Sequence, residues 1–87
     1  MYIIDFETEA IEFGSGLAPK PVGVSIQNGV GGPVQYYGFG HPSMNTCDEA
    51  TAKAELARVW DEELLFHHGK FDISVAIEHW GFKWPKR

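Results

Sequence analysis

The chain has 87 residues, of which 44% are hydrophobic, and three tryptophans and six phenylalanines are among them. This length and composition predict one globular domain with a packed core and exclude a disordered chain. The net charge of −5 has the wrong sign for a protein that binds nucleic acid through a basic surface. Any nucleic-acid role must therefore rest on bound metal and on local contacts.

Cysteine content and hydropathy indicate the cellular compartment in which the protein is expected. The single cysteine, Cys47, excludes a disulfide within the chain, and no apolar run approaches the 18 or so residues of a membrane span. The N-terminus has no basic segment leading into an apolar signal region. We expect a protein of the cytoplasm with no membrane partner.

The first half of the chain predicts three strands. Residues 2–5 are a short apolar strand, and the glycines and prolines of 14–21 indicate a loop. Apolar residues alternate with small or polar ones over 22–27, which is the period of a second strand. The glycine-rich segment 28–33 indicates a turn, and 34–39 is rich enough in aromatic residues to be the third strand. Together they predict an antiparallel hairpin.

The second half predicts two helices separated by a strand. A capping-box spacing begins at Thr46 and predicts a helix that runs to Trp60. Residues 64–67 are a brief apolar run suited to a buried strand. A second helix is expected over 71–79, with Gly81 as its stop.

The order strand, hairpin, helix, strand, helix predicts an α/β fold. Its sheet would be mixed, with one antiparallel hairpin and crossover helices. The strand at 2–5 and the strand at 64–67 should be parallel neighbours. That arrangement would bring the segment "DFE" of the first strand close to the segment "HHGKFD" that follows the later one.

Acidic residues follow both of these strands. Asp5 and Glu7 are two residues apart, so their side chains should point to the same side of the strand. Asp72 lies near the start of a helix, where the helix dipole favours negative charge. Three converging carboxylates are a site for Mg²⁺ or Mn²⁺, because hard divalent cations prefer oxygen ligands.

These segments resemble the first two motifs of the DnaQ-like (DEDD) 3′-5′ exonucleases, and most closely the proofreading domain of family A DNA polymerases. "IIDFETEAI" supplies Asp5 and Glu7 of the Asp-x-Glu motif, and "FHHGKFD" supplies Phe71 and Asp72 at the end of the second. The resemblance implies a ribonuclease H-like sheet. It also implies that residues 1–87 are the N-terminal half of the exonuclease domain.

The chain departs from the family pattern in two places. His68 stands where the second motif usually has Asn. The third motif, a Tyr or His followed by the last Asp, is not present in the 87 residues. The resemblance therefore fits an incomplete fragment or a naturally short form.

The family activity implies a role for each matched residue. In the family, two Mg²⁺ or Mn²⁺ ions assist cleavage of the 3′-terminal phosphodiester of single-stranded DNA. Asp5, Glu7 and Asp72 are the implied catalytic residues and metal ligands, with Asp5 bridging both ions. The implied substrate-binding residues are Thr8, Ile11, His68 and Phe71.

Two alternatives stay open at this point. A truncated relative could keep the fold as an inactive nucleic-acid-binding or dimerising module, completed by a second copy or by a downstream polymerase or exonuclease segment. A ribonuclease of the same superfamily is the other alternative, since the motifs do not distinguish DNA from RNA. We expect no special role for His41 and His79.

Overall fold

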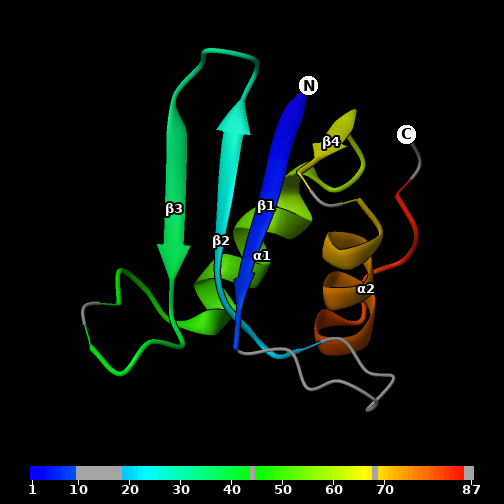
Figure 1. Ribbon diagram of the computed structural model, residues 1–87. Coiled ribbons are helices and arrows are strands. Elements are labelled where there is room, and N and C mark those ends of the chain that lie inside the picture. Colours follow the sequence, from blue (N-terminus) through cyan, green and yellow to red (C-terminus); the bar gives the residue numbers. More distant parts are fainter. Residues whose placement is uncertain (10–18, 44, 68, 86–87) are drawn as a thin grey trace.

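The computed structural model describes residues 1–9, 19–43, 45–67 and 69–85. Figure 1 shows a single sheet with helices packed behind and beside it. Its elements in chain order are β1 (Tyr2–Thr8), β2 (Pro21–Asn28), β3 (Val34–Gly38), α1 (Glu49–Val59), β4 (Leu64–Phe66) and α2 (Gly69–Trp80).

The chain is a small α/β domain with a four-stranded mixed sheet of order β3-β2-β1-β4. β2 is antiparallel to both β1 and β3, whereas β1 and β4 are parallel. The predicted hairpin and the predicted parallel neighbours are confirmed. None of the helices in the described residues is long and apolar enough to cross a membrane.

β1 is longer than its apolar run predicts. It continues to Thr8 because β2 pairs with it over its whole length, with a register shift between Glu7 and Thr8 that pairs Thr8 with Pro21. β4 is much shorter and pairs only with residues 2–4 of β1. Asp5 is therefore the first β1 residue beyond the parallel pairing, although it still lies within the antiparallel pairing with β2.

The helix α1 begins two residues later than a cap at Thr46 requires, so that prediction is wrong. The N-cap is Asp48, whose Oδ1 accepts a hydrogen bond of 2.8 Å from the Thr51 amide. The Thr46 Oγ1 instead accepts from the Gly38 amide at 2.9 Å, which ties the loop to the end of β3. Both residue types cap helices well, and the contact with β3 decides between them.

The end of α2 agrees with the predicted stop. Gly81 has a φ of 70°, a left-handed conformation that glycine adopts without steric cost, and its amide donates to the Ile77 carbonyl at 3.2 Å. The helix also begins earlier than predicted, at Gly69 rather than at residue 71.

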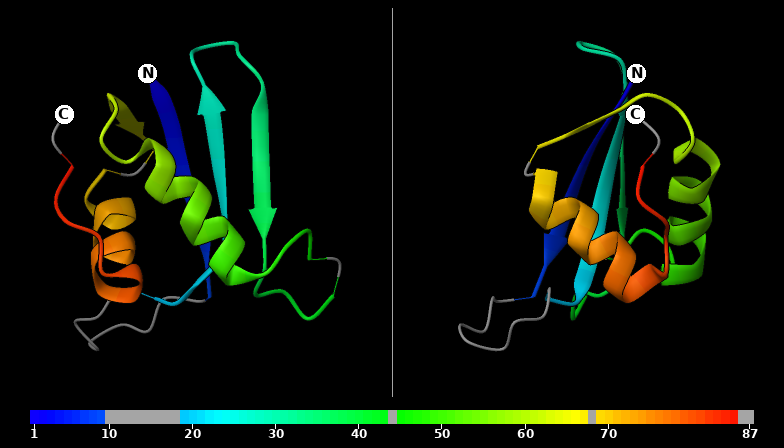
Figure 2. Two further views of the ribbon diagram at one scale, coloured as in Figure 1. Left: turned by 180° about the vertical axis from the view of Figure 1, so that it is seen from behind. Right: turned by 90° about the vertical axis from the view of Figure 1, so that its right-hand side faces the viewer.

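The hydrophobic core lies on one face of the sheet, between the strands and both helices. The left view of Figure 2, in which the molecule is seen from behind, shows α1 crossing the strands on this face, with α2 beside it. Phe6 packs edge-on against Trp80 with ring centroids 5.2 Å apart, and the Trp80 indole donates to Glu49 of α1 at 2.8 Å. The fully or almost fully buried core residues include Ile4, Val24, Ala52, Leu56, Val59, Val75 and Ala76.

Candidate functional site

The two faces of the sheet differ in what covers them. Ile4 and Phe6 of β1 point into the core, so the alternation of strand side chains places Asp5 and Glu7 on the opposite face. The side chains of Ser25 and Tyr36 share that face, because Ser25 pairs with both Asp5 and Tyr36 in the sheet register. No helix among the described residues covers this face, which we call the open face. Asp5 is half-buried there and Glu7 is exposed.

Glu7 turns across β2 toward β3. Its Oε2 accepts a hydrogen bond of 3.3 Å from the Tyr36 hydroxyl, and its Oε1 lies 3.4 Å from the Nε2 of His41. The Tyr36 oxygen and that Nε2 are 2.7 Å apart. The three side chains form a closed cluster, which we call the Glu7–Tyr36–His41 cluster.

Two glycines make room for this cluster. A Cβ at Gly23 would overlap the Tyr36 phenol, and a Cβ at Gly38 would lie 2.8 Å from the Tyr36 ring. Partial burial is the main cause that raises the pKa of Tyr36, and the Glu7 carboxylate raises it further. The phenol therefore stays protonated at neutral pH and acts as a hydrogen-bond donor.

Among the described residues, Asp72 is the carboxylate that is buried in the core. It lies in the first turn of α2, is fully buried, and its Oδ1 accepts a hydrogen bond of 3.1 Å from the Phe6 amide. β4 ends at Phe66, and its last ladder bond is from the His67 amide to the Ile4 carbonyl at 3.1 Å. The next amide along that edge of β1 belongs to Phe6, and Asp72 satisfies it in place of a strand partner.

This contact brings Asp72 to the backbone between Asp5 and Glu7. Asp72 approaches from the helix side of the sheet, while the side chains of Asp5 and Glu7 lie on the open face. Glu7 extends toward β3, away from the β4 side on which Asp72 lies. The sequence correctly predicts that "DFE" and "HHGKFD" are neighbours, but the three carboxylates do not converge as predicted, because Asp72 lies on the opposite face of the sheet from the side chains of Asp5 and Glu7.

The four predicted substrate-binding residues divide into two groups. Thr8 ends β1, and its Oγ1 donates to the Glu9 carbonyl at 3.0 Å. Phe71 is half-buried and packs against the core from the first turn of α2. Ile11 and His68 lie outside the described residues.

The donor chemistry fits a hard divalent cation, but the arrangement fits it only in part. Carboxylates are the ligands that Mg²⁺ and Mn²⁺ prefer. Within the part of the chain that the structure describes, however, no group of three or more acidic, histidine or cysteine side chains is gathered closely enough to hold a metal ion. Binding through all three predicted ligands requires Glu7 to leave Tyr36 and His41, and also requires the buried Asp72 to reach the open face from the helix side of the sheet, so we derive no catalytic step through a metal.

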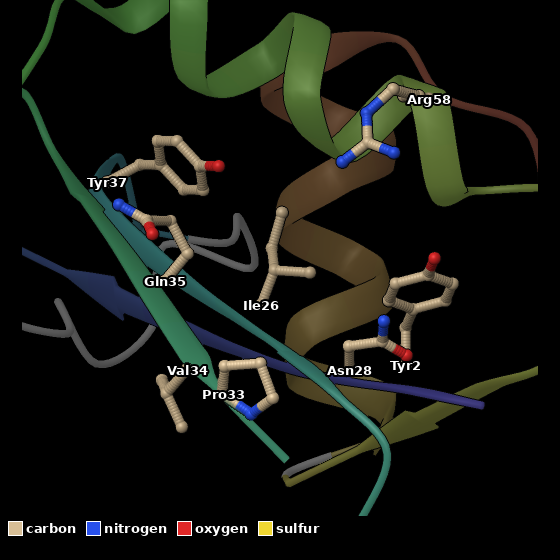
Figure 3. Close-up of a pocket in the computed structure, with 8 residues that line it drawn as sticks. All are labelled: Tyr2, Ile26, Asn28, Pro33, Val34, Gln35, Tyr37 and Arg58. Carbon is tan, nitrogen blue, oxygen red and sulfur yellow. The ribbon is translucent and has the colours of Figure 1, made fainter.

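A pocket of about 300 Å³ lies on the helix-covered side of the sheet, away from Asp5 and Glu7. Figure 3 shows Ile26 at its centre, with Tyr2, Tyr37 and Arg58 around it. Arg58 is paired with Glu55 of the same helix at 2.9 Å. The pocket contains none of the residues that the sequence assigns to a site.

Sequence reasoning did not find the Glu7–Tyr36–His41 cluster. The predicted hairpin could have suggested that Tyr36 lies near β1, given the pairing register. His41 lies in an irregular loop, and no local pattern assigns it to Glu7.

Comparison of the chain with protein-family models, with curated proteins and with solved structures finds no match. Functional inference for this chain therefore depends on its own residues and their geometry.

Proposed function

We propose that the chain carries the first two motifs of a DnaQ-like 3′-5′ exonuclease domain of the proofreading type, which hydrolyses the 3′-terminal phosphodiester of single-stranded DNA. The four-stranded mixed sheet would then be the N-terminal part of a ribonuclease H-like fold. The remaining motif would come from a further segment of the same protein.

One observation carries this proposal: the Asp72 carboxylate bonds the amide of Phe6, the residue between Asp5 and Glu7, at 3.1 Å. Residues 66 positions apart in the sequence meet at this contact. Proximity of an Asp-x-Glu strand and a helical Asp is what the motif pair requires. A buried carboxylate is rare unless it is hydrogen-bonded or has a functional partner, and here it has a defined position beside β1.

The proposal assigns the metal to the Asp5 end of this region. Asp5 and Asp72 would hold Mg²⁺ or Mn²⁺ together with Glu7 after Glu7 turns away from the cluster and the Asp72 carboxylate turns from the helix side toward Asp5. Bound metal would supply an activated water and stabilise the leaving oxygen. The chain's own residues would hold and orient the ion. Because the net charge of the chain is −5, the phosphate would bind to the metal rather than to basic side chains.

A specific observation favours the second candidate, a dimerising or nucleic-acid-binding module without catalysis. Val34 and Leu65 are 59% and 48% exposed, and Tyr36 is 37% exposed. Large apolar side chains in these positions leave surface that a second copy or another segment could cover.

A trimming assay on 5′-labelled single-stranded DNA with Mn²⁺ tests the proposal. We expect no trimming above background by the 87-residue chain, because loss of a general base alone lowers a rate by about 10² to 10⁴. A longer chain that adds a downstream third motif should trim from the 3′ end, and Asp5→Ala or Asp72→Asn should abolish the activity. Asp61→Asn, an exposed position after α1, is the matched control.

Three other outcomes are informative. Trimming of a matched RNA strand alone would support the ribonuclease. Binding of either strand without trimming by the longer chain would support the inactive module. Robust trimming by the 87-residue chain, lost in Asp72→Ala, would show that the site is completed without a further segment, most simply by a second copy.

A further inference from the structure

We propose that the Glu7–Tyr36–His41 cluster is a binding site for a borderline-soft divalent metal of the zinc class, with His41 Nε2 and Glu7 Oε1 as its ligands. This inference does not depend on the proposed nuclease function. It assigns the imidazole of His41, which belongs to neither exonuclease motif, to a metal that would compete for Glu7 with the hard cation of the Asp5 region.

The spacing of the two donor atoms supports tetrahedral coordination. Ligand atoms about 2.0 to 2.2 Å from a tetrahedral zinc ion lie about 3.3 to 3.6 Å from one another. His41 Nε2 and Glu7 Oε1 are 3.4 Å apart. One ion can therefore contact both atoms at this separation once the Tyr36 hydroxyl, which is 2.7 Å from Nε2, turns away from that nitrogen.

The role of Tyr36 follows from its two contacts. The Tyr36 hydroxyl is 3.3 Å from Glu7 Oε2 and 2.7 Å from His41 Nε2. The hydroxyl must leave Nε2 before a metal can occupy the lone pair of that nitrogen, and the phenol can then donate its proton to Oε2 alone. Tyr36 then orients the carboxylate so that Oε1 points to the metal, as neighbours of metal-ligating carboxylates commonly do.

Hydrogen bonds to Asn45 hold the main chain of His41 in place before any metal binds. The His41 amide donates to the Asn45 Oδ1 at 2.9 Å, and the Asn45 Nδ2 donates back to the His41 carbonyl at 2.9 Å. Gly23 and Gly38 provide the space that the Tyr36 ring occupies. Such pre-organisation lowers the entropic cost of binding.

Ligand type and access indicate which metal the site prefers. Imidazole with a carboxylate suits Co²⁺, Ni²⁺, Cu²⁺ and Zn²⁺ better than Mg²⁺, and affinity rises from Co²⁺ to Cu²⁺ and falls again at Zn²⁺. The side chains of His41 and Glu7 are 29% and 56% exposed, so an ion can enter and water can complete its coordination. The site should therefore discriminate against Mg²⁺ through its imidazole.

Titration with Co²⁺ and with Mn²⁺ tests the assignment. All proteins should carry Cys47→Ala, because a thiol binds these metals independently. Co²⁺ should give the intense visible absorption of a tetrahedral site, and Zn²⁺ should displace it. His41→Gln should weaken Co²⁺ binding at least tenfold, and Tyr36→Phe should weaken it less, whereas the exposed control His79→Gln should leave it unchanged.

The two metal sites can be separated by the same titrations. Asp5→Asn should leave Co²⁺ binding unchanged even if it abolishes Mn²⁺ binding. Thermal melting of each variant shows whether it is folded, and the Zn²⁺-induced shift of the His41 Nε2 resonance reports the ligand directly. Co²⁺ binding that survives His41→Gln in a folded protein, or that disappears in the Cys47→Ala parent, would overturn the proposal.

Discussion

The two faces of the sheet are formed by the same strands, but one face presents buried apolar side chains and the other presents polar ones. Side chains from β1 and β2 on the covered face, such as Ile4 and Val24, are completely buried against the helices. On the open face the same strands present Asp5, Glu7 and Ser25, which are half-buried or exposed. Strand alternation therefore separates the residues that stabilise the domain from those available for chemistry.

The junction between the two faces is the edge of β1. Asp72 comes from a helix of the covered side, yet its carboxylate reaches the Phe6 amide at the point where β4 no longer pairs with β1. Because β4 is so short, the Phe6 amide has no strand partner on this edge, and the Asp72 carboxylate accepts its hydrogen bond instead. The predictions below test how independent the faces are, from the largest expected effect to the smallest.

The largest contrast is between two leucines. Leu56 of α1 is fully buried, whereas Leu65 of β4 is 48% exposed on the open face. Leu56→Ala should lower the free energy of unfolding by about 2 to 5 kcal/mol, because it leaves a cavity. Leu65→Ala should lower it by less than about 1 kcal/mol. Equal losses in urea denaturation would show that the open face is covered in solution.

Asp72 should contribute to stability in addition to any chemical role. Asp72→Ala removes the acceptor of the buried Phe6 amide, and we expect a loss of about 1.5 to 3 kcal/mol in the free energy of unfolding. Asp72→Asn keeps an oxygen at that position and should lose less. If both variants unfold at the wild-type denaturant concentration, the contact does not hold α2 to β1.

Gly23 tests the packing of Tyr36 on the open face. Gly23→Ala should cost about 1 to 2 kcal/mol of unfolding free energy, because its Cβ would overlap the phenol and force the ring to move. In a Tyr36→Ala background the same substitution should cost much less. A cost that is unchanged in that background would show that the strain lies in the backbone of β2.

The smallest expected effect concerns the α1 cap. The hydrogen bond from Thr51 holds the pKa of Asp48 below its ordinary value of 3.8. The cap's charge therefore stabilises the fold above that value and loses its contribution as pH falls through the lower value of the folded state. Melting of wild type and Asp48→Asn should differ more at pH 7 than at pH 2.5, and a pH-independent difference would contradict this assignment.

Local patterns were sufficient to predict the order of the elements, the hairpin and the parallel pairing. The end of β1 was not predictable from its apolar run, since it depends on how far β2 continues along it. The choice between Thr46 and Asp48 as the cap also depended on a tertiary contact, the bond from Gly38.

Of the candidate site, the position of Asp72 next to β1 was predictable, but the direction of the Glu7 side chain was not. Parallel β1 and β4 bring Asp72 to the backbone beside Asp5, as the sequence indicates. The direction of the Glu7 side chain was not predictable, because it depends on a tyrosine two strands away and on a loop histidine.

The proposed function requires that Asp5 and Asp72 together bind a hard divalent cation, Mg²⁺ or Mn²⁺. Mn²⁺ binding, followed by the electron paramagnetic resonance signal of the free ion, tests it most directly. We expect weak binding at millimolar Mn²⁺ that Asp5→Ala abolishes, that Asp72→Asn weakens, and that His41→Gln leaves in place. Mn²⁺ binding by a folded Asp5→Ala protein at the wild-type level would contradict it.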